Sequence, residues 1–365
     1  MPCIPSRHCR YIIYLESVSR NGPVPQRPLK PDGRDGGIEG RHVGTSQRDP
    51  LAWGRYLAVA GAYAACYELT RNISFSHWML PAGLRLACLL LVPRRFWPAL
   101  AVGEALPIAE MAALHASLFG GLWACAASLP PILLCMPAMA WLRRRYELVG
   151  ADGQVNMGLI LAATLVCAAI TTGANALTLS TVSMADGSAA PAPTLPILLA
   201  WVLGCYLGAL TLTPLILAIR ERVAAQPGGV PTWNALRHSP LMRDALLFAV
   251  PCLALLLLVA GGAEGDETLL TCIRVGMAVP VIALTLRHGW HGAAAGGMLA
   301  SVAQASTSFQ LQDPAMIRSQ AILAFVASTA LIFGVRVAQR IAAAQRAARN
   351  GIPVPAPAPS PSIRR

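Results

Sequence analysis

The chain has 365 residues, of which 55% are hydrophobic and 13% are charged, whereas an average soluble domain has about 25% charged residues. This shortage of charge excludes most soluble proteins, because a soluble chain of this length needs a charged surface. The formal net charge is +12, from 29 Lys and Arg against 17 Asp and Glu. In a membrane protein such an excess usually lies in cytoplasmic loops, so we expect membrane lipid as a partner and no nucleic acid.

Residues 1–50 are expected to form a disordered, basic segment rich in proline and glycine. Its apolar run at residues 11–15 is too short for the hydrophobic region of a signal peptide. The first apolar helix after it is therefore expected to act as its own insertion signal.

Apolar runs of helical length recur through the next part of the chain and predict an all-α, polytopic bundle of membrane helices. Ten helices are expected, at about 51–69, 79–93, 95–113, 118–142, 156–179, 196–219, 244–261, 268–287, 291–308 and 320–341. The transmembrane domain then covers 51–341, and 342–365 form the end of a basic helix and a proline-rich tail. Some runs are short or rich in glycine, so eight helices with one re-entrant hairpin is the alternative.

Arginine alternates between the two sets of loops in this arrangement. Loops after even-numbered helices, and the end of the last helix, hold Arg94, Arg95, Arg143, Arg144, Arg145, Arg220, Arg222, Arg237, Arg243, Arg287, Arg336, Arg340, Arg346 and Arg349. The opposite loops hold Arg71, Arg318 and the acidic Glu264, Asp266 and Glu267. We therefore expect a multi-pass protein of the bacterial inner membrane with both termini in the cytoplasm. Residues 336–349 should continue the last helix against anionic lipid.

The sequence contains no motif of a metal centre, a nucleotide-binding loop or a hydrolase, so we expect no enzyme activity, no metal and no cofactor. His288 and His291 are too few ligands for a metal site. Eight cysteines lie singly within apolar runs and are interpreted as small core residues: Cys66, Cys88, Cys125, Cys135, Cys167, Cys205, Cys252 and Cys272.

Four ionisable residues within the expected helices are candidates for binding a signal or for holding the bundle together. Arg85 and Glu104 are equally far in sequence from the turn at 94–95. They should therefore lie at one depth, about 14 Å from the cytoplasmic end, and form an ion pair. Glu110 and Arg274 lie deeper and would pair if their helices are neighbours. A structural role is favoured, because buried pairs specify packing at least as often as they bind ligands.

Glycines such as Gly204 and Gly208, and Gly292 with Gly296 and Gly297, allow helices to approach closely. Packing within the chain is favoured over a homo-oligomer interface, because a bundle of this size has many internal contacts.

Several short motifs occur in an order that is typical of one family. The matching positions are Pro81, Gly83, Leu84, Arg85, Pro93, Arg94, Trp97, Pro98, Gly208, Pro214, Pro280, Gly289, Trp290 and Gly292. On these residues the chain resembles the type-one membrane-associated sensor (MASE) domain. It is most similar to the membrane half of the sensor histidine kinase for hexose-phosphate uptake, in which a glutamate stands where this chain has Glu104.

The resemblance implies an integral membrane sensory module of bacterial signal transduction, usually joined to a kinase or cyclase output domain. The sequence after Ala343 has no motif of such a domain. We therefore expect action through a partner: a sensor kinase, a response circuit or a transporter-like membrane protein. Many relatives of the cyclase-linked branch carry aspartate where this chain has Cys205. The alternative function is a small-molecule transporter or channel, which the lack of a convincing internal repeat disfavours.

Overall fold

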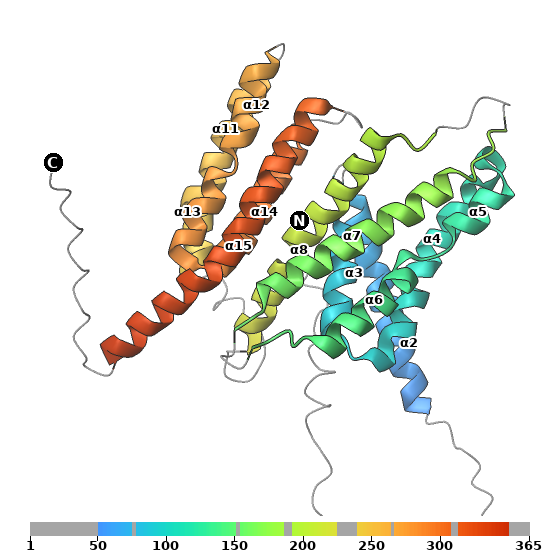
Figure 1. Cartoon of the computed structure of the whole chain (residues 1–365), viewed down its shortest axis with the longest axis horizontal. Helices are drawn as coiled ribbons and strands as arrows, with labels where there is room; N and C mark the ends of the chain where they lie inside the picture. The colour runs from blue at the N-terminus through green and yellow to red at the C-terminus, as the bar shows by residue number, and fades with distance from the viewer. Residues whose placement is uncertain are drawn as a thin grey trace, which may run out of the picture.

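The computed structural model describes residues 50–74, 78–150, 154–185, 192–224, 239–263, 266–307 and 313–349. Within these ranges the secondary structure is helical and includes no β-strand. Figure 1 shows the helices packed side by side in one bundle, with α11 to α15 on one side and α2 to α8 on the other. The all-α fold predicted from the sequence is confirmed.

The helices in the first part of the bundle overlap the ranges expected from the sequence. It contains, in order, α2 (Pro50–Asn72), α3 (Leu80–Leu91), the 3-10 turn η1 (Arg94–Phe96), α4 (Trp97–Phe119), α5 (Gly121–Ala127), α6 (Pro131–Arg145), α7 (Met157–Leu179) and α8 (Leu195–Ala224). The range expected as one helix at 118–142 is broken into α5 and α6, because Pro130 and Pro131 cannot continue a helix and instead begin the next one.

The second part contains α10 (Pro240–Asp244), the π-helical turn η2 (Ala245–Ala249), α11 (Val250–Gly262), α12 (Glu267–Gly276), α13 (Val279–His288), α14 (Trp290–Ala305) and α15 (Pro314–Arg349). The helix expected at 268–287 is interrupted at Met277 and Ala278, before Pro280. The 36 residues of α15 include 336–349, so the expected helical continuation is confirmed.

Seven helical segments of the described chain are long and apolar enough to cross a membrane: Arg94–Phe119, Gly121–Arg145, Met157–Leu179, Leu195–Ala224, Pro240–Gly262, Glu267–His288 and Pro314–Ala347. Helices α3 and α14 are shorter, with 12 and 16 residues, and α2 carries charged residues. Each of the ten expected ranges overlaps a helix, but the count of ten membrane crossings is not confirmed.

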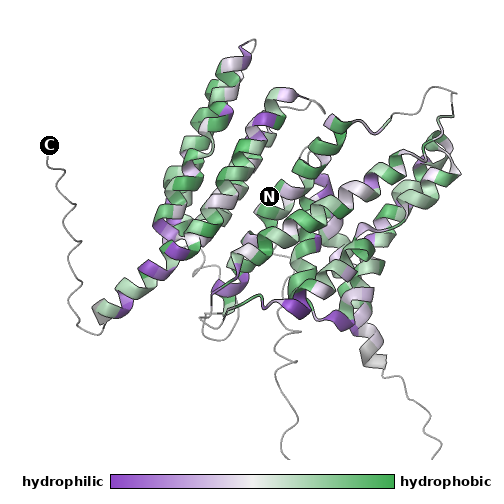
Figure 2. Cartoon of the chain, viewed as in Figure 1, coloured by the Kyte–Doolittle hydropathy of each residue, from purple (hydrophilic) through white to green (hydrophobic). Residues whose placement is uncertain are grey.

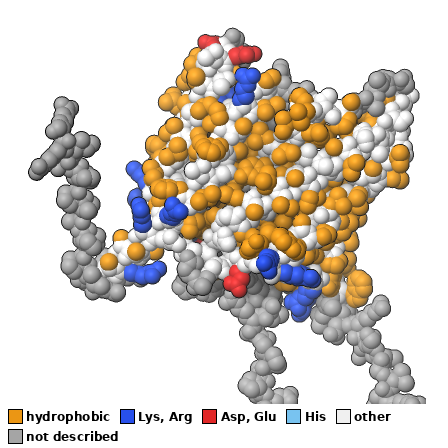
Figure 3. All heavy atoms as spheres, viewed as in Figure 1, with side chains coloured by type: hydrophobic (Ala, Val, Ile, Leu, Met, Phe, Trp, Pro, Cys, Tyr) orange, Lys and Arg blue, Asp and Glu red, His pale blue; other side chains and the backbone are white. Residues whose placement is uncertain are grey.

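The outer surface of the bundle is apolar between two more polar ends. Figure 3 shows hydrophobic side chains across the middle of the visible face and most of the Lys and Arg side chains along its lower rim. Figure 2 shows the same separation along the helices. Leu258 and Phe325 are 77% and 73% exposed, which suits contact with lipid rather than water. The chain is therefore a multi-pass membrane protein.

The start of α2 and the end of α15 both lie at the arginine-rich rim (Figure 1). We call this rim the basic end of the bundle. The expected disordered N-terminal segment, the proline-rich tail, and the loop residues Arg237 and Glu264 lie outside the described residues.

Candidate functional site

A salt bridge between Arg85 of α3 and Glu104 of α4 lies inside the first part of the bundle. Nη2 of Arg85 is 2.8 Å from Oε1 of Glu104, and Nε of Arg85 is 3.1 Å from the same oxygen. Arg85 is 3% exposed and Glu104 is fully buried. The ion pair predicted from equal depths in the hairpin is present.

Three further helices donate to this pair or accept from it. The hydroxyl of Tyr63 in α2 donates to Oε2 of Glu104 at 2.7 Å, and Nη1 of Arg85 donates to the Thr171 hydroxyl in α7 at 3.0 Å. The backbone N–H of Ile132 donates to Oε1 of Glu104 at 3.2 Å. Because first-turn amides have no acceptor in their own helix, the carboxylate completes the N-terminus of α6. We call these five residues the ion-pair network.

The ion-pair network joins α2, α3, α4, α6 and α7 through one positive and one negative charge. Removing either charge leaves the other uncompensated in a medium of low dielectric constant, which costs about 3–5 kcal/mol. Both oxygens of Glu104 already accept hydrogen bonds from the protein. The arrangement therefore fixes how these helices pack. Any other packing would require the hydrogen bonds of the network to be exchanged.

The turn between α3 and α4 is fixed by cationic and aromatic residues. Arg94 donates to the Ala140 carbonyl at 2.8 Å, and Arg143 of α6 donates to the Val92 carbonyl at 3.0 Å. The guanidinium carbons of Arg94 and Arg143 lie 5.9 Å and 5.8 Å from the ring centre of Trp97. Arg143 thereby satisfies the Leu89 and Val92 carbonyls, which lack a helical partner at the end of α3. This turn holds the two helices of the hairpin, α3 and α4, in place and so keeps Arg85 and Glu104 at the same depth.

The prolines of the family motif mark helix starts. Pro81, Pro98 and Pro280 occupy the first turns of α3, α4 and α13, where a residue without an N–H loses no helical bond. Pro93 immediately precedes η1. Pro214 differs, because it lies buried inside α8.

Glycines let α3 and α8 cross at close range. A Cβ atom at Gly83 would lie 2.5 Å from the Gly208 carbonyl oxygen, and one at Gly208 would clash with the backbone of Met79. At the same crossing the Thr213 hydroxyl donates to the Gly83 carbonyl at 3.0 Å, and the Met79 N–H donates to the Gly204 carbonyl at 3.0 Å. The Gly204 and Gly208 pair is thus used for packing within the chain, as expected. Leu84, which follows Gly83 in α3, is buried.

A similar close approach joins α13, α14 and α15. Gly289 has a φ of 64°, a left-handed value that favours glycine, and a Cβ there would lie 2.7 Å from the Gly334 carbonyl oxygen. A Cβ at Gly292 would clash with the Leu284 backbone. Trp290 is 2% exposed at the start of α14. These motif residues therefore position α14 against its neighbours.

Glu110 and Arg274, expected to pair if their helices are neighbours, do not meet. Nη1 of Arg274 lies 3.0 Å from Oδ2 of Asp313, and its Nε donates to the Thr307 hydroxyl at 2.9 Å. Glu110 is exposed on α4. Depth alone could not identify the partner, because α12 packs on α11 and α15, so Arg274 meets the segment before α15.

Asp313 also begins α15, since its Oδ1 accepts the N–H of Ala315 at 2.9 Å and of Met316 at 3.2 Å. Partial burial acts to raise the pKa of Asp313, but the bond from Met316 and the bond from Arg274 outweigh it and hold the pKa below its usual range.

The two histidines beside Gly289 have different partners. Nε2 of His288 lies 3.0 Å from Oδ2 of Asp244, whereas Nε2 of His291 lies 3.4 Å from Oε2 of Glu221. Within the described ranges, no group of three or more His, Cys, Asp or Glu side chains is placed to hold a metal ion. Cys205 is buried with its thiol 3.5 Å from the Met79 thioether.

Sequence reasoning missed Tyr63, Thr171 and Asp313. A tyrosine in an apolar run does carry a signal, because a buried hydroxyl needs a partner. Thr171 gave none, since a threonine can bond to its own helix. Asp313 directly before Pro314 is a typical helix start, and that pattern could have identified it.

Fold and site together define a class: a polytopic, all-α membrane domain whose helices are joined by a buried ion-pair network. The MASE1 family model matches residues 50–340, which run from the start of α2 to within α15. The chain belongs to this family of membrane-associated sensor domains. Among curated proteins and solved structures, none matches the chain.

Proposed function

We propose that this chain is a sensory module of the bacterial inner membrane that passes its signal through α15 to a separate protein at the cytoplasmic face. The observation that carries the proposal is the MASE1 match over residues 50–340, because this family is a sensory membrane domain rather than a catalytic one. The positive-inside rule supports a cytoplasmic position for the basic end of the bundle, where α2 starts and α15 ends.

Helix α15 has the length required for an output element. Its 36 residues extend for about 54 Å at 1.5 Å per residue, whereas the hydrocarbon core of a bilayer is about 30 Å thick. Its C-terminal part carries Arg336, Arg340 and Arg346, which favour the cytoplasmic headgroup region.

Direct contacts connect the ion-pair network to α15. Thr171 of the network lies on α7, and both α7 and α8 pack against α15. The Tyr206 hydroxyl of α8 lies 2.8 Å from the Ser328 hydroxyl of α15. A signal that rearranges the bonds of Arg85 and Glu104 would therefore displace α7 relative to α15, which is a physical route for coupling.

The resemblance to the hexose-phosphate branch favours a sensor kinase, a response circuit or a transporter-like membrane protein as the partner. Domain boundaries near 51 and 341 fit this function. The family match ends at residue 340, and the arginine-rich part of α15 extends beyond it to Arg349.

A photo-reactive amino acid in place of Arg340 tests the proposal in living cells. The expected result is a covalent adduct with one defined signalling or transport protein. The matched control replaces Phe325, which lies on the same helix but is 73% exposed in its apolar half and should contact lipid. Sustained solute flux by the purified protein in liposomes, together with no protein adduct at position 340, would replace this proposal with a transporter.

A further inference from the structure

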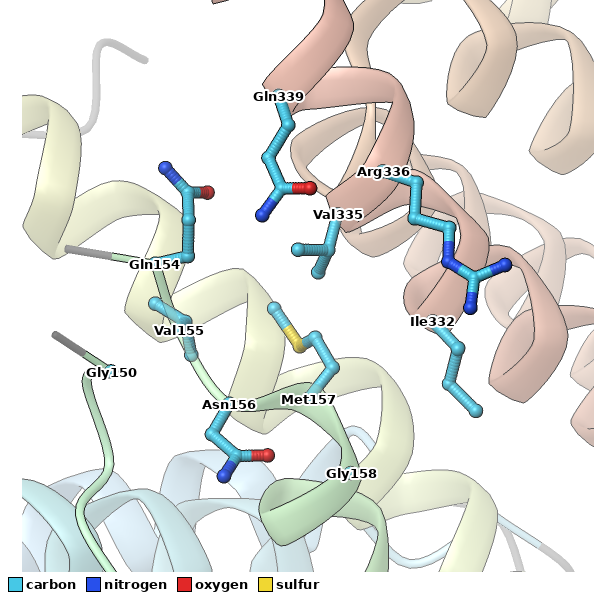
Figure 4. A pocket seen from close by; sticks show the side chains of 10 residues that line it. All are labelled: Gly150, Gln154, Val155, Asn156, Met157, Gly158, Ile332, Val335, Arg336 and Gln339. Atoms are coloured by element: carbon cyan, nitrogen blue, oxygen red, sulfur yellow. The ribbon is translucent and has the colours of Figure 1, made fainter. Parts of the chain in front are cut away.

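A groove of 410 Å³ lies between the start of α7 and the second half of α15. One wall is formed by Gly150 and residues 154–158, and the other by Ile332, Val335, Arg336 and Gln339. Figure 4 shows Met157 and Val335 facing one another between the two walls, with Gln339 reaching in from α15.

The α15 wall changes from apolar to polar toward the basic end of the bundle. Ile332, Val335, Arg336 and Gln339 follow helical spacing and therefore share one face, over about 10 Å of the helix. The apolar pair lies on the membrane side, and the cationic and amide side chains lie toward the cytoplasmic headgroups. A phospholipid has this same order, from acyl chain to phosphate.

The charge of the groove is positive. Arg336 is exposed and forms no ion pair with any residue of the described ranges. No acidic residue is among the described residues that line the groove, and α15 contains none along its length. An anion in the groove would meet no opposing charge from this described lining, and a juxtamembrane arginine attracts anionic lipid.

We infer that this groove binds one anionic glycerophospholipid of the cytoplasmic leaflet. Its phosphate lies at Arg336, and one acyl chain lies along Ile332, Val335 and Met157. This binding does not depend on the sensory function proposed above.

The test uses the full chain in neutral detergent, with phosphatidylglycerol and phosphatidylcholine of identical acyl chains, and native mass spectrometry as the measurement. Phosphatidylglycerol is expected to bind saturably and more tightly. Arg336→Gln should weaken its binding by roughly fivefold. Arg340→Gln is the matched control, because it removes the same charge from the same helix but does not line the groove. Equal losses in both variants would show diffuse attraction and overturn the site.

Filling the groove gives a second test that leaves the charge unchanged. Gly158 is exposed on the α7 wall, and a Cβ there would meet only Asn156 Oδ1, at 3.5 Å. Gly158→Phe should therefore fold, keep its thermal stability in phosphatidylcholine and lose saturable phosphatidylglycerol binding. Unchanged binding would overturn the inference. Competition by inorganic phosphate alone would also overturn it, because the occupant would then be a free anion. If Gly158→Phe instead abolished a dimer and left lipid binding intact, the occupant would be a second copy of the chain.

Discussion

The energetic coupling between Arg85 and Glu104 can be measured with two substitutions that remove the charges. Arg85→Met keeps an unbranched, flexible side chain without the charge, although it is shorter than arginine. Glu104→Gln keeps one oxygen that can accept from the N–H of Ile132, and its amide N–H can donate to the Tyr63 hydroxyl oxygen. Each single variant leaves one buried charge without its counterion, whereas the double variant leaves none.

The expected magnitudes follow from the burial of both side chains. With Arg85 3% exposed and Glu104 fully buried, each single substitution should reduce the free energy of unfolding by about 3–5 kcal/mol. The double variant loses the hydrogen bonds between the two replaced groups and the bond from Arg85 to the Thr171 hydroxyl, which together cost about 1–3 kcal/mol. The coupling energy is then on the order of several kcal/mol.

The assay is unfolding of the purified protein in mixed micelles, for the wild type, both single variants and the double variant. Strictly additive losses would refute the reasoning, because they would mean that the two side chains do not interact. Leu106→Ala is a suitable control on the same helix as Glu104, since Leu106 is 60% exposed and should be nearly neutral.

The charge swap Arg85→Glu with Glu104→Arg should restore stability only in part. An arginine at 104 restores the ion pair but cannot accept from Tyr63 or from the N–H of Ile132. Each unsatisfied donor costs about 1–3 kcal/mol. Full restoration would contradict the hydrogen bonds described for Glu104.

Three other predictions concern packing, pH and lipid. Gly208→Leu should prevent α3 from approaching α8 and abolish folding. Gly61→Leu should fold, because a Cβ at Gly61 would meet no atom within 4 Å. Size-exclusion chromatography in detergent compares the two variants. The pKa of Asp313 is lowered by folding, so its contribution to stability is present above about pH 4, the unfolded pKa, and is lost as pH falls through the folded value. Asp313→Asn should remove that part of the acid sensitivity of melting, and an unchanged pH profile would contradict the bond to Arg274. Replacing the four arginines of 336–349 by glutamine should weaken the orientation of the chain in the membrane or its coupling to the partner. A C-terminal reporter measures the orientation, and adduct formation measures the coupling. No change in either would show that this segment is dispensable.

The part of the site that could be predicted from the sequence depends on one hairpin. Arg85 and Glu104 flank a short turn, so counting residues from Arg94 was enough to place them at one depth. Glu110 and Arg274 belong to helices far apart in the chain, and their pairing required knowledge of which helices are neighbours. That knowledge was absent from the hydropathy pattern, so the pairing could be stated only on the condition that the two helices are neighbours, which the structure does not meet.

Two remaining bonds of the network, to the Thr171 hydroxyl and from the N–H of Ile132, lacked a sequence signal because they involve neutral groups. The N–H of Ile132 became a donor only because Pro130 and Pro131 start α6 beside Glu104. The same prolines explain why the single helix expected at 118–142 is divided into α5 and α6. By contrast, the spacing of Gly204 and Gly208 was informative, since close helix approach leaves few other choices.

The central claim is that the ion-pair network and the C-terminal end of α15 are coupled. The most direct test measures adduct formation from a photo-reactive amino acid at position 340 in the wild type and in the folded double variant Arg85→Met with Glu104→Gln. The account predicts the same partner with a changed adduct yield, because the bond from Arg85 to Thr171 on α7 is lost. An unchanged yield, at equal protein abundance, would contradict it.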